Sequence, residues 1–156
     1  MVGCSRVTAG CDHCYAERLA PRLQATGVDG YDGVVVSTPD GPRWTGRVNV
    51  AESRLDQPFR WVKPRRVFVN SMSDLFHRDV SIDDIARVWA VMAASPQHTF
   101  QVLTKRPPRM EKLLNDPGFE RLVDLTGTRR LASRRPGTTP SASAPAGNPP
   151  TLPAPS

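Results

Sequence analysis

Apolar residues along the chain predict a strand, a helix and a second strand in its central part. Residues 67–69 form a continuous apolar run bounded by turn signals, and residues 99–103 form a second strand-like segment. Between them, residues 82–93 repeat apolar side chains at helical spacing behind Ser81, a good N-cap residue. This order predicts a right-handed βαβ unit whose first strand is buried on both faces, as in a parallel sheet.

The remaining segments carry weaker patterns. Residues 16–25 predict a short amphipathic helix that packs Leu19 and Leu23 on a sheet. Residues 34–37 and 44–50 predict the two strands of a hairpin. Further short helices are predicted at residues 53–61, 109–114 and 119–125.

The composition changes sharply near the end of the chain. From Thr126 to Ser156 there is no acidic or aromatic residue, and seven of the sixteen prolines lie there. Such a segment cannot bury enough apolar surface to offset the entropy lost when it becomes ordered. We therefore predict an α/β domain over residues 1–125 and a disordered tail over residues 126–156.

The basic charge follows the same boundary. The formal net charge is +6, but four arginines lie in the predicted tail, which leaves residues 1–125 with 17 basic and 15 acidic residues. The high pI therefore gives little reason to expect a folded nucleic-acid surface. No apolar run has the length of a membrane span, and the first residues lack a signal-peptide pattern. We predict a cytoplasmic protein with no membrane contact.

The three cysteines of the chain, Cys4, Cys11 and Cys14, lie within eleven residues. Three thiolates on one short loop can hold a metal centre and leave a coordination position open. The residues alone allow three interpretations. They are an iron–sulfur cluster, a Cys₃His zinc site completed by His13 or His77, and unligated thiols or a disulfide pair.

Two polar segments form a second candidate site. Residues 70–74 follow the first predicted strand, and residues 104–106 follow the second. Because the carboxyl ends of parallel strands meet at one edge of a sheet, we expect these loops to converge there, where α/β proteins bind ligands. The same residues also fit a helix-capping turn and solvated basic side chains.

Three segments of the sequence resemble a known family. They are the Cys-x₆-Cys-x₂-Cys motif followed by Tyr-Ala-Glu, residues 67–77 and residues 100–107. Together they are similar to the phage-associated three-Cys-motif family of unassigned activity. That family resembles a divergent branch of the radical S-adenosylmethionine (SAM) superfamily, nearest in pattern to the spore photoproduct lyase group. The usual superfamily spacing is Cys-x₃-Cys-x₂-Cys, so the first gap is longer here.

This resemblance implies a [4Fe–4S] cluster held by Cys4, Cys11 and Cys14, with an open iron that binds SAM. Reductive cleavage of SAM would give a 5′-deoxyadenosyl radical that abstracts a hydrogen atom from the substrate. An acidic residue in the corresponding lyase loop makes Asp74 the foremost candidate for a SAM contact. The full set of predicted SAM-binding residues is Asn70, Ser71, Ser73, Asp74, Thr104 and Lys105.

The resemblance also implies the fold, a partial (β/α) barrel of radical SAM type with a hairpin excursion. A complete barrel of that type has more strands than the sequence predicts, and its first strand precedes the cysteine loop. We therefore predict a fragment of a radical SAM-like enzyme that is inactive alone. The alternatives are a small zinc-binding module without catalysis and a nucleic-acid-processing or nucleic-acid-binding protein. The substrate is unknown; a nucleic acid and a partner protein encoded nearby are candidate partners.

Overall fold

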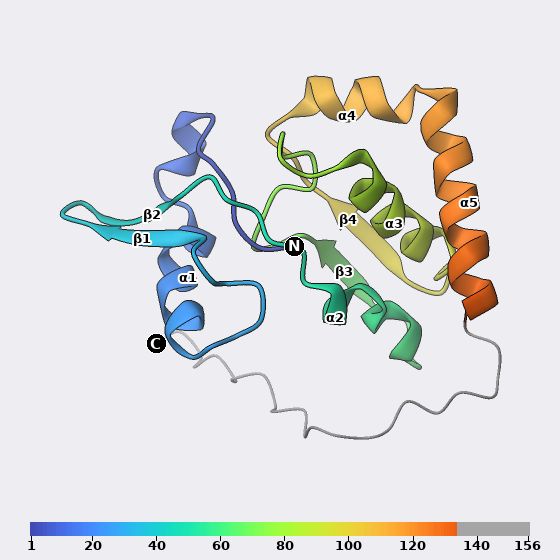
Figure 1. The fold of residues 1–156 in the computed structure, drawn as a ribbon, viewed down its shortest axis with the longest axis horizontal. Helices are drawn as coiled ribbons and strands as arrows, with labels where there is room; N and C mark the ends of the chain where they lie inside the picture. The colour runs from blue at the N-terminus through green and yellow to red at the C-terminus, as the bar shows by residue number, and fades with distance from the viewer. Residues whose placement is uncertain (134–156) are drawn as a thin grey trace.

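Two small sheets organise the structure, a computed structural model that describes residues 1–133 (Figure 1). An antiparallel hairpin pairs β1 (Val35–Thr38) with β2 (Gly41–Trp44), and a parallel pair joins β3 (Arg66–Val69) to β4 (Thr99–Val102). Over this part of the chain the fold is mixed α/β, and the strands do not close into a barrel.

Helices flank both sheets. The α1 helix contacts the β1–β2 hairpin, and α3 packs against α5 beside the parallel pair (Figure 1). Two 3₁₀ turns, η1 (Ala9–Cys11) and η2 (Gln57–Arg60), complete the elements. The α-helices are α1 (Tyr15–Ala25), α2 (Glu52–Leu55), α3 (Ile82–Ala93), α4 (Pro107–Leu114) and α5 (Pro117–Ser133).

The predicted βαβ unit is confirmed. Strands β3 and β4 are parallel with Val67 opposite Phe100, and α3 connects them. The Ser81 side chain accepts a hydrogen bond from the Asp84 backbone N–H at 3.0 Å, which makes it the N-cap of α3. The prediction that β3 is buried on both faces is wrong, because Phe68 is 44% exposed. That face of the strand borders a cavity instead.

Two hydrophobic cores support the molecule. The larger lies around the βαβ unit, and the smaller lies between α1 and the hairpin. The larger core contains Val69, Leu75, Phe76, Val80, Ile85, Ala86, Leu113 and Phe119. The smaller contains Val2, Ala20, Tyr31, Val34 and Val35.

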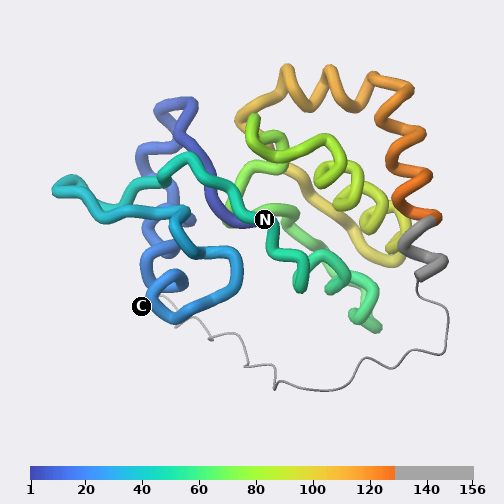
Figure 2. Tube along the Cα trace, viewed as in Figure 1, coloured from blue at the N-terminus to red at the C-terminus, as the bar shows by residue number. Residues whose placement is uncertain are grey.

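The first residues of the chain join the two parts. The amino terminus lies at the middle of the molecule (Figure 2). Val2 pairs with Asn49 in antiparallel orientation, and Gly3 pairs with Ser73 in parallel orientation. The cysteine loop therefore starts beside the carboxyl end of β3.

The predicted amphipathic face of α1 is partly wrong. Leu19 is 40% exposed, whereas Ala16, Glu17 and Ala20 are buried. The helix turns its small residues to the hairpin because Glu17 accepts a hydrogen bond from the Trp44 backbone N–H at 2.8 Å.

Two other boundaries differ from the prediction. The hairpin exists, but its second strand is Gly41–Trp44 and not residues 44–50, since Thr38 pairs with Gly41 and leaves a tight two-residue turn between them. The helix predicted over residues 53–61 is divided into α2 and the 3₁₀ turn η2, whose first residues include Pro58.

The α5 helix extends into the segment that the composition predicts to be disordered. Residues 126–133 continue this helix to Ser133 instead of beginning a disordered tail. A Cβ added at Gly127 would lie 3.8 Å from the Ala90 Cβ, so α5 approaches α3 closely at this point. The disorder predicted for residues 134–156 lies outside the described residues. None of the described helices combines the length and apolar character needed to cross a membrane.

Candidate functional site

A cavity of about 340 Å³ lies between the cysteine loop and the carboxyl ends of β3 and β4. The predicted convergence of the two strand-end loops is confirmed, because Asp74 from the first loop bonds to Thr104 from the second at 2.7 Å. Nine predicted site residues line this cavity: Cys4, Cys11, Cys14, Asn70, Ser71, Ser73, Asp74, Thr104 and Lys105.

Glycine starts the cysteine loop for a steric reason. Gly3 has φ of +102°, and a Cβ built on it would lie 2.1 Å from the Arg47 carbonyl oxygen. Both the left-handed backbone and the close approach exclude a side chain here. Further along the loop, the Arg6 Nε donates to the buried Glu17 carboxylate at 3.1 Å, which holds the loop on α1.

The three thiols are free, and their environments differ. Cys11 is buried, with Lys105 Nζ at 3.5 Å from its Sγ. Burial raises the pKa of Cys11, but hydrogen bonds from Val7 and Thr8 and the Lys105 charge lower it by more, so the net pKa lies below its usual value. For Cys4, burial outweighs the opposing effect of Arg106 and raises the pKa. The thiolate form is therefore favoured at Cys11 over Cys4.

In the described part of the chain, the three cysteines line one cavity but are not grouped with other ligands around a single ion position. Within the described side chains, no three His, Cys, Asp or Glu residues lie close enough together to hold one metal ion. A structural zinc site needs four ligands around the same ion. The three cysteines that hold a [4Fe–4S] cluster bind different irons, so their sulfurs lie farther apart than the ligands of one ion but must still surround the same cluster. Cys4, Cys11 and Cys14 all line the same cavity.

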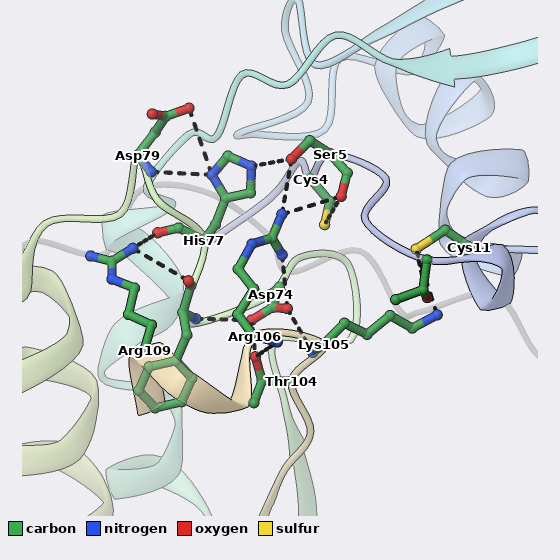
Figure 3. Close-up of polar contacts among 12 residues, drawn as sticks. Cys4, Ser5, Cys11, Asp74, His77, Asp79, Thr104, Lys105, Arg106 and Arg109 are labelled. Atoms are coloured by element: carbon green, nitrogen blue, oxygen red, sulfur yellow. Dashed lines mark hydrogen bonds and ion pairs between the residues drawn. The ribbon is translucent and has the colours of Figure 1, made fainter. Parts of the chain in front are cut away.

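Asp74 connects the loop after β3 to the loop after β4 through hydrogen bonds. Its buried carboxylate accepts hydrogen bonds from the Lys105 backbone N–H at 3.0 Å and from Arg106 Nη1 at 2.9 Å, besides the bond from Thr104 (Figure 3). The Phe76 backbone N–H donates to it at 2.9 Å. Four donors occupy the acceptor capacity of the carboxylate. A ligand that contacts it directly would have to displace one of them.

His77 holds a place that sequence reasoning missed. The sequence makes it a candidate zinc ligand; in the structure it is fully buried, with its Nε2 at 2.8 Å from Ser5 Oγ. Burial is the largest cause that lowers the pKa of His77, followed by the Arg106 charge, so the ring is neutral near pH 7. Arg106 Nη2 donates to the same Ser5 Oγ at 2.9 Å. No local pattern reveals these contacts, which span 72 and 101 residues.

The chain that forms this cavity can be compared with known protein families, proteins and structures. A family model described as a protein of unknown function (DUF5131) matches residues 1–135. The chain belongs to the DUF5131 family. No curated protein and no solved structure matches it. The DUF5131 match contains all of the residues that line the cavity.

The cavity of this DUF5131 protein also has an apolar wall. Large apolar side chains that are exposed to solvent gather around it. Tyr15 is held there by a hydrogen bond from its hydroxyl to the Ser71 carbonyl at 2.8 Å. Apolar walls with a few convergent polar groups are typical of small-molecule sites. The exposed apolar residues that line the cavity are Val7, Tyr15, Phe68 and Leu103.

Proposed function

We propose that this chain is the cofactor-binding part of a radical SAM-type enzyme. It would hold a [4Fe–4S] cluster through Cys4, Cys11 and Cys14 and bind SAM in the adjoining cavity. One observation carries the proposal: three free thiols line the same cavity as the polar loops that follow two parallel strands. The resemblance to the phage-associated three-Cys-motif family points to the same chemistry.

The strand arrangement supports the finer assignment to a partial barrel of radical SAM type. Gly3 pairs in parallel with Ser73, which lies in the loop after β3, so the cysteine loop starts at the edge where the loops after β3 and β4 leave the sheet. Ligands in parallel α/β folds bind at this edge. The polar groups and the metal-binding groups of the proposed site would then lie at the same edge of the parallel sheet.

The chain itself would bind, orient and shield the ligands. When bound, the cluster would supply the electron for reductive cleavage of SAM. Lys105, at 3.5 Å from the Cys11 sulfur, favours a thiolate there. The apolar wall suits the flat adenine ring, and Asn70, Ser71 and Ser73 offer amide and hydroxyl groups to the polar end of SAM.

The two cations near the cavity differ in what they can still bind. Arg106 is engaged by Asp74 and Ser5. Lys105 Nζ contacts the Cys11 sulfur but has two further hydrogen atoms to donate. Lys105 is therefore the better candidate for the SAM carboxylate.

Anaerobic reconstitution tests the proposal. After addition of iron and sulfide, we expect bound iron and sulfide and a visible charge-transfer band. Each of Cys4→Ala, Cys11→Ala and Cys14→Ala should lose the cluster, whereas His13→Ala should keep it. SAM should change the spectrum of the reconstituted wild-type protein.

Two results would contradict the proposal. The first is iron uptake that does not depend on all three cysteines. The second is one stable zinc ion per chain after expression in minimal medium, with no response to SAM, which favours a zinc-binding module.

A further inference from the structure

We propose that Ser5, His77 and Arg106 form a latch that positions Cys4 at the cavity. The three residues are named the Ser5 latch below. His77 Nε2 lies 2.8 Å from Ser5 Oγ, and Arg106 Nη2 lies 2.9 Å from the same oxygen and 3.3 Å from the Ser5 carbonyl oxygen (Figure 3). Both side chains therefore hold the residue that directly follows Cys4.

The direction of the His77 hydrogen bond follows from its second nitrogen. The Asp79 backbone N–H donates to His77 Nδ1 at 3.2 Å, so Nδ1 carries the lone pair. In a neutral ring the other nitrogen then carries the hydrogen atom, and Nε2 donates to Ser5 Oγ. From α4, Arg109 donates to the backbone carbonyls of His77 and Val80, which fixes the segment that carries the ring.

Arg106 is equally constrained. Its Nη1 lies 2.9 Å from Asp74 Oδ2, and both side chains are largely buried. Because Asp74 also binds Thr104 and the Lys105 backbone, the Ser5 latch connects the cysteine loop to both strand-end loops. Displacement of Ser5 would leave buried donors without an acceptor, which is costly.

The other two cysteines have separate supports. Cys11 belongs to η1 and contacts Lys105, and Cys14 occupies the N-cap position of α1. The Cys4 thiol bonds to the Ser5 carbonyl at 3.5 Å, and its other side-chain partner is Arg106, which itself belongs to the latch. The position of Cys4 therefore depends on how firmly Ser5 is held.

The importance of this latch for a metal centre rests on the proposed function, but the positioning itself can be measured in metal-free protein. The full-length chain is treated with a chelator and alkylated with iodoacetamide, and each cysteine is quantified by mass spectrometry. We expect Ser5→Ala and His77→Ala to raise the alkylation rate of Cys4 about three- to tenfold, as expected for the loss of one net hydrogen bond. The Cys14 rate should stay unchanged.

Three further variants separate positioning from a general loss of stability. The Ser5→Ala/His77→Ala double variant should be no faster than Ser5→Ala alone, because Ser5→Ala already removes the oxygen that His77 binds. His77→Gln offers an amide N–H in place of Nε2 and should restore most of the wild-type rate. Arg78→Ala, at the exposed neighbour of His77, should behave as wild type.

The latch is refuted if Ser5→Ala leaves the Cys4 rate unchanged, or if Cys4 and Cys14 accelerate together. Independent, multiplicative effects of the two substitutions would also refute it. If His77→Ala fails to fold, Ser5→Ala and His77→Gln still decide the question. Failure to reconstitute a cluster would reject the proposed function and leave these metal-free rates unaffected.

Discussion

The two parts of the molecule are stabilised in different ways. Around the βαβ unit, eight buried residues form the larger core, whereas five form the core between α1 and the hairpin. In the smaller part, a buried polar contact adds to this packing, because Glu17 is bound by Arg6 and by the Trp44 backbone. The cysteine loop belongs to this smaller part. Its geometry therefore depends on hydrogen bonds to the larger part, in addition to its own packing.

The largest expected loss of stability comes from a substitution in the larger core. Phe76 is fully buried and packs edge-on against Trp89, with ring centroids 5.8 Å apart. Phe76→Ala should lower the free energy of unfolding by about 3–5 kcal/mol, measured by urea denaturation. Val36→Ala, at a position that is 49% exposed in the hairpin, is the control and should change it by less than about 0.5 kcal/mol. A similar loss for both variants would mean that burial of Phe76 in the larger core does not set the size of the effect.

An intermediate effect is expected where the two parts meet. Gly3→Ala introduces a Cβ 2.1 Å from the Arg47 carbonyl oxygen at a φ of +102°. We expect a loss of about 2–3 kcal/mol in the free energy of unfolding, since backbone strain and a steric clash combine. Gly27→Ala is a matched control, because Gly27 also has positive φ but a Cβ there would meet no atom within 4 Å. Its loss should be about 1 kcal/mol. Equal losses would show that the contact with Arg47 is unimportant.

The smallest expected effect is the contribution of Glu17 to stability and its dependence on pH. Burial raises the pKa of Glu17, but the Arg6 guanidinium and the Trp44 N–H lower it by more, so the folded-state pKa lies below the usual value. The ionised carboxylate therefore stabilises the fold above the pKa of an unfolded glutamate, and this contribution is lost as pH falls through the folded-state pKa.

Thermal melts of wild type and Glu17→Gln between neutral and acidic pH test this assignment. The variant should be less stable by about 1 kcal/mol at pH 7, and the difference should shrink as the pH falls. A difference that is constant with pH would mean that Glu17 acts through shape alone.

The sequence predicts well what local signals encode. The apolar run of β3 and the Ser81 cap of α3 are local features, and the structure contains both. The convergence of the polar loops then follows from the geometry of a parallel βαβ unit. For this reason the cavity could be outlined from residues 70–74 and 104–106.

Long-range polar contacts could not be predicted. The burial of His77 depends on Ser5, 72 residues away, and no periodic pattern marks that pair. The face of α1 is misjudged because Glu17 satisfies its charge with Arg6 and the Trp44 N–H, which allows a carboxylate to replace Leu19 in the interior. The length of α5 is missed because composition does not reveal the close approach of Gly127 to Ala90.

The separation between Ser5 and Arg106, which is 101 residues, also has a consequence for biosynthesis. A ribosome that adds about 5–20 residues per second needs about 5–20 s to cover that interval. During this time the nascent thiols have no partner from the second half of the protein. A metal centre delivered to the growing chain would therefore reach a cysteine loop that Arg106 does not yet hold. A metal centre delivered to the finished chain would reach a loop that Arg106 holds at Ser5.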